Sequence, residues 1–157
     1  MDVGSGNGYP SSALSNFAPH KFVLDGVEIA SMEGFLQSLK FENIDMQNHV
    51  CTLVGIKAKL KGKRKKWWKK QELYWQGNIY KRNSQDYITL IKRAYMAMVL
   101  QNKGFRLALI ASGDCTFTHT IGKNKIEETV LTEKEFCNCL YDARCIAFTL
   151  LSQKESE

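Results

Sequence analysis

The sequence predicts an α+β fold, in which a single and mostly helical domain carries a small antiparallel sheet. Apolar residues recur at three- and four-residue spacing over several stretches, which is typical of amphipathic helices. One pair of short segments alternates apolar and polar residues around Asp25-Gly26, which is typical of a β-hairpin. No GxGxxG or P-loop motif occurs, so we do not expect an array of parallel βαβ units.

Length and composition indicate one globular domain. The chain has 157 residues, of which 44% are hydrophobic and 11% aromatic, and these values exclude a disordered chain. We expect one domain over residues 1–157, with a core at about 8–150 and a frayed tail at 152–157.

The sequence lacks the features that would place the chain in a membrane or an oxidising compartment. No apolar run approaches the roughly 18 residues of a membrane span, and the first residues have no signal-peptide character. The five cysteines are odd in number and form no CxxC pair, which favours reduced thiols in a cytoplasm. Cys137 and Cys139 have the wrong spacing for zinc and the three histidines are scattered. We therefore expect a cytoplasmic protein with no membrane partner, no metal and no cofactor.

The hairpin is expected to lead directly into a helix. Segments 21–24 and 27–30 alternate so that one face is buried, and Asp25-Gly26 supplies the positive φ angles of a two-residue type I′ turn. Ser31 follows the second segment. Its hydroxyl can accept an otherwise unpaired amide of the first turn, so we expect it to cap a helix over residues 32–40.

The remaining elements follow from apolar spacing and capping signals. Helices are predicted at 46–59, 84–101 and 105–111. Thr132 and Glu135 form a capping box that opens a last helix through Leu151. Residues 4–19 are rich in Gly, Ser and Asn and should be irregular, and residues 114–124 should form a polar loop with a short strand at its centre.

Three polar residues line up on the helix that Ser31 opens. Glu33, Gln37 and Lys40 stand at i, i+4 and i+7, so a carboxylate, an amide and an amine share one face. A catalytic constellation has this form, and so does an ordinary solvated helix face. The spacing alone leaves both interpretations open.

Positive charge is concentrated in one basic segment, defined here as residues 57–70. The segment holds nine Lys and Arg residues and no acidic residue, whereas the net charge of the whole chain is +6, so the rest of the chain is net negative. Cations interleaved with tryptophans suit a polyanion, because cations hold phosphates and indoles stack on bases. The alternative is a solvated loop whose tryptophans enter the core. The residues expected to bind nucleic acid are Lys63, Arg64, Lys65, Lys66, Trp67 and Trp68.

A wider pattern resembles a known family. The LSNF segment at 14–17, the hairpin, and the S-x-E-x-x-x-Q-x-x-K pattern from Ser31 to Lys40 are similar to the N-terminal signature of the NADAR family, the YbiA-like N-glycosidases. The similarity runs over about residues 8–150. It departs late in the chain, where YbiA-type members carry W-G-x-G-x-x-x-x-G-x-N and this sequence keeps only Gly122 and Asn124.

The resemblance implies a NADAR/YbiA-like fold and cleavage of an N-glycosidic bond between ribose-5-phosphate or ADP-ribose and a base-like group. One branch of the family acts on riboflavin-pathway intermediates, and another removes ADP-ribose from guanine in nucleic acid or nucleotides. We expect the second activity, with the basic segment delivering a polymeric substrate. The alternatives are the riboflavin-type substrate and a non-catalytic nucleic-acid-binding module, whose binding would depend steeply on salt and survive the loss of Glu33.

The resemblance also implies roles for the three residues in the row. Cleaving a ribosyl C–N bond builds positive charge on the sugar, so the site needs a carboxylate near C1′, and Glu33 is the expected catalytic carboxylate. Lys40 is the second expected catalytic residue. It would hold a phosphate or, with its pKa depressed by burial, attack an opened ribose as an amine. Gln37 would orient ligand hydroxyls or Glu33.

Five further residues are expected to contact the substrate. Asn16 and Phe17 come from the LSNF segment, where Asn16 either contacts the ligand or caps a turn. Trp75 would stack on the base or lie in the core. His119 would bind phosphate or protonate the leaving base, and Asp114 has a weaker claim of the same kind.

Overall fold

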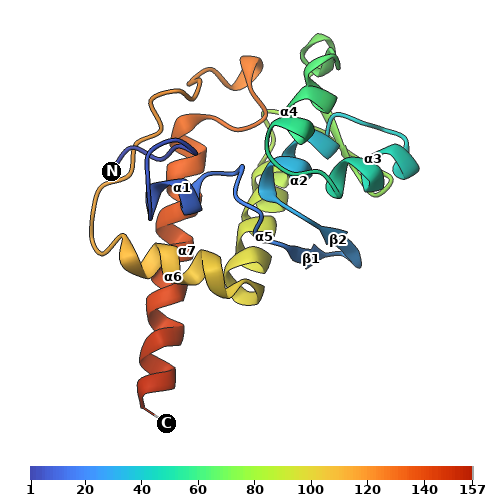
Figure 1. Cartoon of the computed structure of the whole chain (residues 1–157). Coiled ribbons are helices and arrows are strands. Elements are labelled where there is room, and N and C mark those ends of the chain that lie inside the picture. Colours follow the sequence, from blue (N-terminus) through green and yellow to red (C-terminus); the bar gives the residue numbers. More distant parts are fainter. Residues whose placement is uncertain (157) are drawn as a thin grey trace.

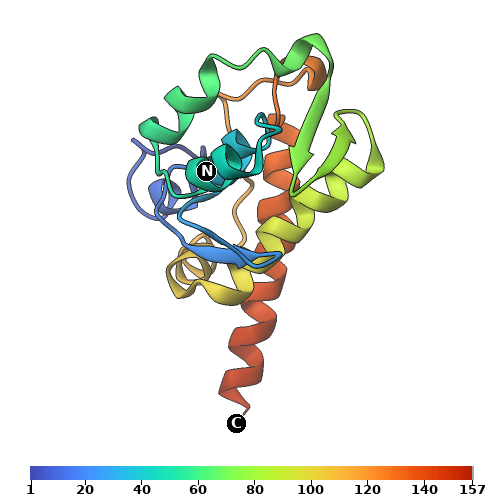
Figure 2. The ribbon, with the colours of Figure 1, turned by 90° about the vertical axis from the view of Figure 1, so that its right-hand side faces the viewer.

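Two helices that pack together, α5 (Gln85–Gln101) and α7 (Glu133–Glu155), form the framework of the molecule. The structure is a computed structural model that describes residues 1–156 (Figure 1). Helix α6 (Lys103–Ala111) packs against both framework helices. The N-terminal segment with its short helix α1 (Ser11–Leu14) lies against α6. In both views the C-terminal half of α7 extends away from the rest of the molecule (Figures 1 and 2).

The predicted hairpin and the helix after it are confirmed. Strands β1 (Phe22–Leu24) and β2 (Val27–Ile29) pair antiparallel, and Asp25 and Gly26 between them have φ angles of 50° and 78°. Helix α2 spans Met32–Ser38, two residues short of the expected end, so Lys40 lies just beyond it; the Ser31 hydroxyl accepts the amide of Gly34 in its first turn. The local turn and capping chemistry that the sequence predicted is therefore present at both elements, and distant contacts such as that of the Ser31 hydroxyl with the Leu53 carbonyl add to it.

The single helix expected at 46–59 is wrong, because the structure contains two. Helix α3 spans Ile44–Cys51 and α4 spans Ile56–Lys63. The break falls at Gly55, whose φ of +59° lies outside the helical range. Because the helix is interrupted, carbonyl groups near the break bond to other parts of the chain. The Cys51 carbonyl accepts the amide of Ala30 at 2.8 Å.

A second hairpin was not predicted. Strands β3 (Glu72–Trp75) and β4 (Asn78–Lys81) pair antiparallel after a single turn of 3₁₀ helix, η1 (Trp67–Lys69). The turn residues Gln76 and Gly77 both have positive φ, at 46° and 89°. This hairpin lies beside α5 (Figure 2).

The helices expected in the second half are confirmed, with small shifts at their ends. Asn102 ends α5 and its side chain also caps α6, which begins two residues earlier than expected. The capping box of Thr132 and Glu135 is present at the start of α7. Helix α7 continues through Glu155, so the expected frayed tail is helical over most of its length.

The polar stretch at 114–124 is a loop, and its expected strand is reduced to one bridge. Asp2 and Thr118 form an isolated parallel bridge, which joins the N-terminus to this loop. A second 3₁₀ turn, η2 (Ile126–Glu128), follows. The core between the helices includes Phe35, Trp75 and Phe136. Within residues 1–156, no helix is long and apolar enough to cross a membrane.

Candidate active site

Helix α2 is fixed at its N-terminus by contacts from three parts of the chain. The Ser31 hydroxyl accepts the amide of Gly34 at 3.0 Å and donates to the carbonyl of Leu53 at 2.9 Å. The amide of Glu33 donates to the carbonyl of Asn16 at 2.9 Å. A Cβ on Gly34 would lie 2.6 Å from the Leu53 carbonyl oxygen, so only glycine permits this close approach. The helix that carries Glu33 therefore has a defined position.

Of the predicted row, Glu33 and Gln37 lie on α2 as a hydrogen-bonded pair, and Lys40 lies just beyond the end of the helix and lines the same cavity. The side-chain amide of Gln37 donates to Oε1 of Glu33 at 2.9 Å. Gln37 is only 7% exposed, and within residues 1–156 its own Oε1 has no hydrogen-bond partner. That oxygen lies against Gly62 of α4, where a Cβ would come within 1.9 Å of it. Helix α4 can approach the row only because residue 62 has no side chain.

Burial shifts the pKa values of Glu33 and Lys40, the two ends of the row. Burial raises the pKa of the Glu33 carboxyl, against the opposing effects of the Gln37 hydrogen bond and of nearby cations that include Lys40 and Lys59. Burial likewise lowers the pKa of the Lys40 amine, although the charge of Glu33 works against this shift. Perturbed groups of opposite charge beside a cavity are typical of functional sites.

The row faces a cavity of about 620 Å³, a size typical of small-molecule sites. Its walls come from α2, α4 with η1, the N-terminal loop, and the two loops before α7. Four lysines besides Lys40 line it: Lys59, Lys63, Lys65 and Lys123. The cavity is therefore rich in cations around one perturbed carboxylate, a charge distribution that suits an anionic ligand.

Asn16 and Phe17 of the LSNF segment line the cavity. The amide oxygen of Asn16 accepts the hydroxyl of buried Tyr95 at 2.6 Å, while its backbone carbonyl accepts the amide of Glu33. These contacts occupy the oxygen atoms of Asn16 and leave its Nδ2 as a donor beside the cavity. Tyr95, a buried residue of α5, thus orients a cavity residue.

His119 reaches the cavity from the loop before η2. Its Nδ1 lies 2.7 Å from the carbonyl oxygen of Val3, so Nδ1 carries the proton and donates. Its ring packs edge-on against Phe136, with centroids 4.9 Å apart. Nε2 is consequently the nitrogen available for chemistry.

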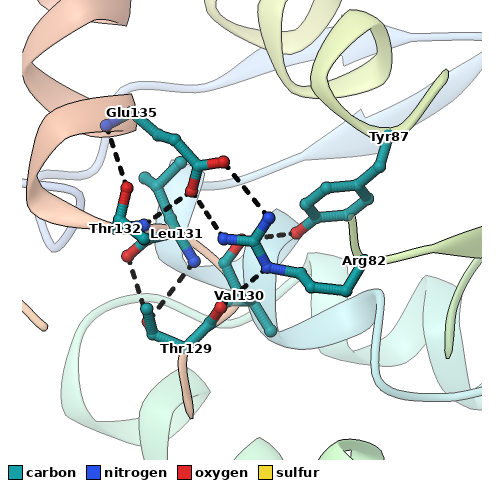
Figure 3. Close-up of polar contacts among 7 residues, drawn as sticks. All are labelled: Arg82, Tyr87, Thr129, Val130, Leu131, Thr132 and Glu135. Atoms are coloured by element: carbon teal, nitrogen blue, oxygen red, sulfur yellow. Dashed lines mark hydrogen bonds and ion pairs between the residues drawn. The ribbon is translucent and has the colours of Figure 1, made fainter. Parts of the chain in front are cut away.

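A buried arginine fastens the part of the cavity wall that lies before α7, and no local pattern in the sequence marks it. Arg82 is 1% exposed; it donates to both carboxylate oxygens of Glu135 and, through Nε, to the carbonyl of Thr129 at 2.8 Å (Figure 3). The Tyr87 hydroxyl donates to the carbonyl of Val130 at 2.6 Å. Figure 3 shows these side chains converging on the short segment before α7. Because Thr129 and Val130 line the cavity, this cluster sets the shape of its wall.

Comparison with known proteins assigns the family. Residues 8–145 match the family model described as bacteriophage protein GP30.3. The chain belongs to this family. A 17.1 kDa protein of enterobacteria phage T4, from the Gp30–rIII intergenic region, is 37% identical over 144 residues, which are 89% of this chain and 93% of the phage T4 protein.

The GP30.3-family chain also shares its fold with a solved structure. The NMR structure of the E. coli protein YbiA superposes with a TM-score of 0.62 at 16% sequence identity, covering 100% of this chain and 87% of YbiA. The YbiA-like fold implied by the NADAR resemblance is thereby confirmed. Identity at this level establishes the fold alone.

Two of the predicted contact residues of this GP30.3-family protein lie outside the cavity. Trp75 is 1% exposed, packs edge-on against Phe35 and donates from Nε1 to Asp25 at 2.8 Å. It is therefore a core residue, as one of the two sequence interpretations held. Asp114 is exposed in the loop after α6 and does not line the cavity.

The basic segment divides between the cavity and the outer surface. Lys63, Lys65, Trp67 and Trp68 line the cavity, whereas the other two residues expected to bind nucleic acid, Arg64 and Lys66, do not. Trp67 is 8% exposed and belongs to the core, while Trp68 is 53% exposed. The interpretation that the tryptophans enter the core therefore holds for Trp67 and fails for Trp68.

Proposed function

We propose that this GP30.3-family protein is a hydrolase that cleaves a ribosyl N-glycosidic bond. The observation that carries the proposal is the row of Glu33, Gln37 and Lys40 inside a lysine-rich cavity of about 620 Å³. The YbiA-like fold supports it, and so does the resemblance of the same residues to the NADAR N-glycosidases.

The proposed chemistry uses Glu33 at the anomeric carbon. As the C1′–N bond breaks, its electron pair stays on the base nitrogen and positive charge develops on the sugar, where the Glu33 carboxylate stabilises it. A water oxygen forms the new bond to C1′ and its proton passes to Glu33, whose pKa is raised by burial and is thereby better matched to accepting a proton. His119, in its imidazolium form, gives a proton from Nε2 to the departing base.

The cations of the cavity account for the phosphate-bearing part of the substrate. Lys59, Lys63 and Lys123 line the same cavity as Glu33, and ammonium groups bind phosphates as point charges. Lys40 either joins them or, with the pKa of its amine lowered by burial, adds to C1′ of the ring-opened ribose; the base nitrogen then leaves with the electron pair of the C1′–N bond and a proton, and water afterwards releases the sugar from the lysine. The Nδ2 of Asn16 is a donor for a sugar hydroxyl.

We further propose that the substrate is ADP-ribosylated guanine within nucleic acid. Every Lys and Arg of the basic segment is exposed, and the segment runs from α4 along the cavity to Trp68. Lys69 lies over the Trp68 ring at 5.9 Å, so an aromatic face and a cation stand together at the cavity rim. Stacking and phosphate contacts of this kind hold single strands without reading their sequence.

The test is a substrate panel. The protein is incubated with an oligonucleotide carrying ADP-ribosylated guanine, with ADP-ribosylated guanosine, and with a ribosylamino-pyrimidine phosphate, and mass spectrometry follows release of the sugar. We expect release from the oligonucleotide by the wild type and by Glu28→Gln, which alters an exposed carboxylate on β2, but not by Glu33→Gln. Release only from the pyrimidine substrate would move the assignment to riboflavin-type intermediates. Salt-sensitive binding without release from any substrate would favour a binding module.

A further inference from the structure

The loop that carries His119 has little structure of its own. It contains one turn, in which the amide of Gly122 donates to the His119 carbonyl at 2.9 Å. A Cβ on Gly122 would lie 2.7 Å from the imidazole Cδ2, so the ring occupies the space left by the glycine. Neither contact sets which imidazole nitrogen is protonated. The position of the loop and the tautomer of His119 must therefore be set by residues outside the loop.

Residues at the N-terminus hold the loop that carries His119. The amide of Val3 donates to the carbonyl of Thr118 at 2.8 Å, and the amide of Thr118 donates to the carbonyl of Met1 at 2.9 Å. Val3 is fully buried, so its carbonyl has a fixed position when it accepts the Nδ1 proton of His119. The orientation and tautomer of the imidazole therefore depend on an N-terminal segment more than a hundred residues away in the sequence.

The carboxylate of Asp2 joins the two residues that flank His119. Its Oδ1 accepts the Thr118 hydroxyl at 3.0 Å and the Thr120 amide at 2.9 Å, and its Oδ2 accepts the Thr120 hydroxyl at 2.9 Å. The hydrogen bonds from Thr120 and Thr118 also lower the pKa of this carboxyl, which keeps it ionised. Asp2 is itself anchored, because its backbone carbonyl accepts the Ser11 hydroxyl at 2.7 Å.

We propose that Asp2 is a positioning residue of the candidate active site. It holds the backbone on both sides of His119, so that Nδ1–H donates to Val3 and Nε2 is the nitrogen presented to the cavity. Asp2 is not among the residues that line the cavity, so it acts only through His119. The catalytic use of His119 rests on the proposed function, whereas the control of its tautomer does not.

The test is the tautomer of His119 in Asp2→Ala, measured by long-range ¹H–¹⁵N spectra of protein labelled at histidine, at a pH where the ring is neutral. In the wild type, and in the control Asp86→Ala from the exposed first turn of α5, we expect the Nδ1–H form alone. In Asp2→Ala we expect a mixture of both tautomers. Asp2→Asn retains an oxygen that accepts the Thr120 amide, so its tautomer ratio should lie between those of the wild type and Asp2→Ala. This variant keeps the test usable if Asp2→Ala fails to fold.

A pure Nδ1–H tautomer in folded Asp2→Ala would overturn the proposal. On a substrate that the wild type cleaves, we also expect kcat to fall about tenfold in Asp2→Ala with KM little changed, because the ring is then held less well for proton transfer from Nε2 while the residues that bind the substrate are unaltered. A tautomer change in a protein that cleaves no substrate would uphold the positioning role and reject the hydrolase assignment. An unchanged tautomer in a variant that still cleaves its substrate normally would reject the positioning role of Asp2 and uphold the hydrolase assignment.

Discussion

The row on α2 and the basic segment face the same cavity, but they are held in opposite ways. Glu33 and Gln37 are bonded to each other on a helix fixed by Ser31, and burial shifts the pKa of Glu33. Every Lys and Arg in residues 57–70 is exposed, and among residues 1–156 none of these cations forms an ion pair. The comparison teaches that charge alone does not identify a reactive group. Burial shifts the pKa values of Glu33 and Lys40 in the row, whereas the exposed cations of the basic segment attract anions from solution.

The largest effect should come from breaking a buried charge pair of the cavity wall. Arg82→Met leaves Glu135 without its partner, and we expect a loss of about 3–5 kcal/mol in the free energy of unfolding. Its neighbour provides the control, because Lys81 pairs with Glu72 at the surface and Lys81→Met should cost at most about 1 kcal/mol. Urea denaturation measures both. Equal losses would show that the buried cluster is no more important than a surface pair.

The contact between the row and α4 should be almost as sensitive. Alanine normally stabilises a helix by about 1 kcal/mol relative to glycine, but a Cβ at position 62 would collide with Gln37. We therefore expect Gly62→Ala to destabilise the protein by about 1–3 kcal/mol and to slow cleavage, since Gln37 is pushed away from Glu33. Gly6→Ala, in a turn where the added Cβ meets open space, is the control for the added methyl group. A more stable Gly62→Ala variant would refute the close approach of α4.

The pH dependence of stability should reveal the burial of Glu33. Its folded pKa lies above the unfolded value near 4.5, so the native state binds the extra proton and ionisation at higher pH destabilises it. Glu33→Gln removes this penalty. We expect a higher melting temperature than wild type at pH 7, and a difference that shrinks as the pH falls through the folded pKa toward 4.5. A variant less stable than wild type at pH 7, with the gap closing in acid, would mean that Glu33 is stabilised as an anion.

The smallest effects should come from single lysines of the basic segment. Lys63→Gln and Lys65→Gln should each lower the salt dependence of oligonucleotide binding by about one ion in a plot of log K against log salt. Lys154→Gln, on the exposed end of α7, should leave that slope unchanged. Fluorescence anisotropy at several salt concentrations measures the slopes. Identical slopes for all three variants would remove the basic segment from the binding surface.

The sequence predicted the elements that neighbouring residues determine. The type I′ turn at Asp25-Gly26 and the Ser31 cap depend on residues at most three positions apart, and both are present. The break at Gly55 was missed because the apolar spacing continues across it, although the glycine supplies the positive φ that the break needs. The second hairpin turns at Gln76-Gly77, where both residues have positive φ; glycine is a turn signal there, but glutamine at the first position is not.

The candidate site was predictable only where it lies on one helix or matches a family motif. Glu33, Gln37 and Lys40 could be found from helical spacing together with the resemblance, and the structure brings His119 and Asn16 to the same cavity. The supporting contacts could not be found this way. Arg82 lies 53 residues from its carboxylate partner Glu135, and the Asp2 contacts join residues 116 and 118 positions apart, so no local pattern marks them.

The central claim is that Glu33 performs the reaction and does not merely bind the substrate. The most direct measurement compares Glu33→Gln with wild type on one ADP-ribosylated oligonucleotide, recording the Kd by anisotropy and the single-turnover cleavage rate at saturating protein. We predict a Kd within a few-fold of wild type and a rate at least about 10²-fold lower, because the substitution removes a charge that acts in the transition state. A wild-type cleavage rate in Glu33→Gln would contradict the account.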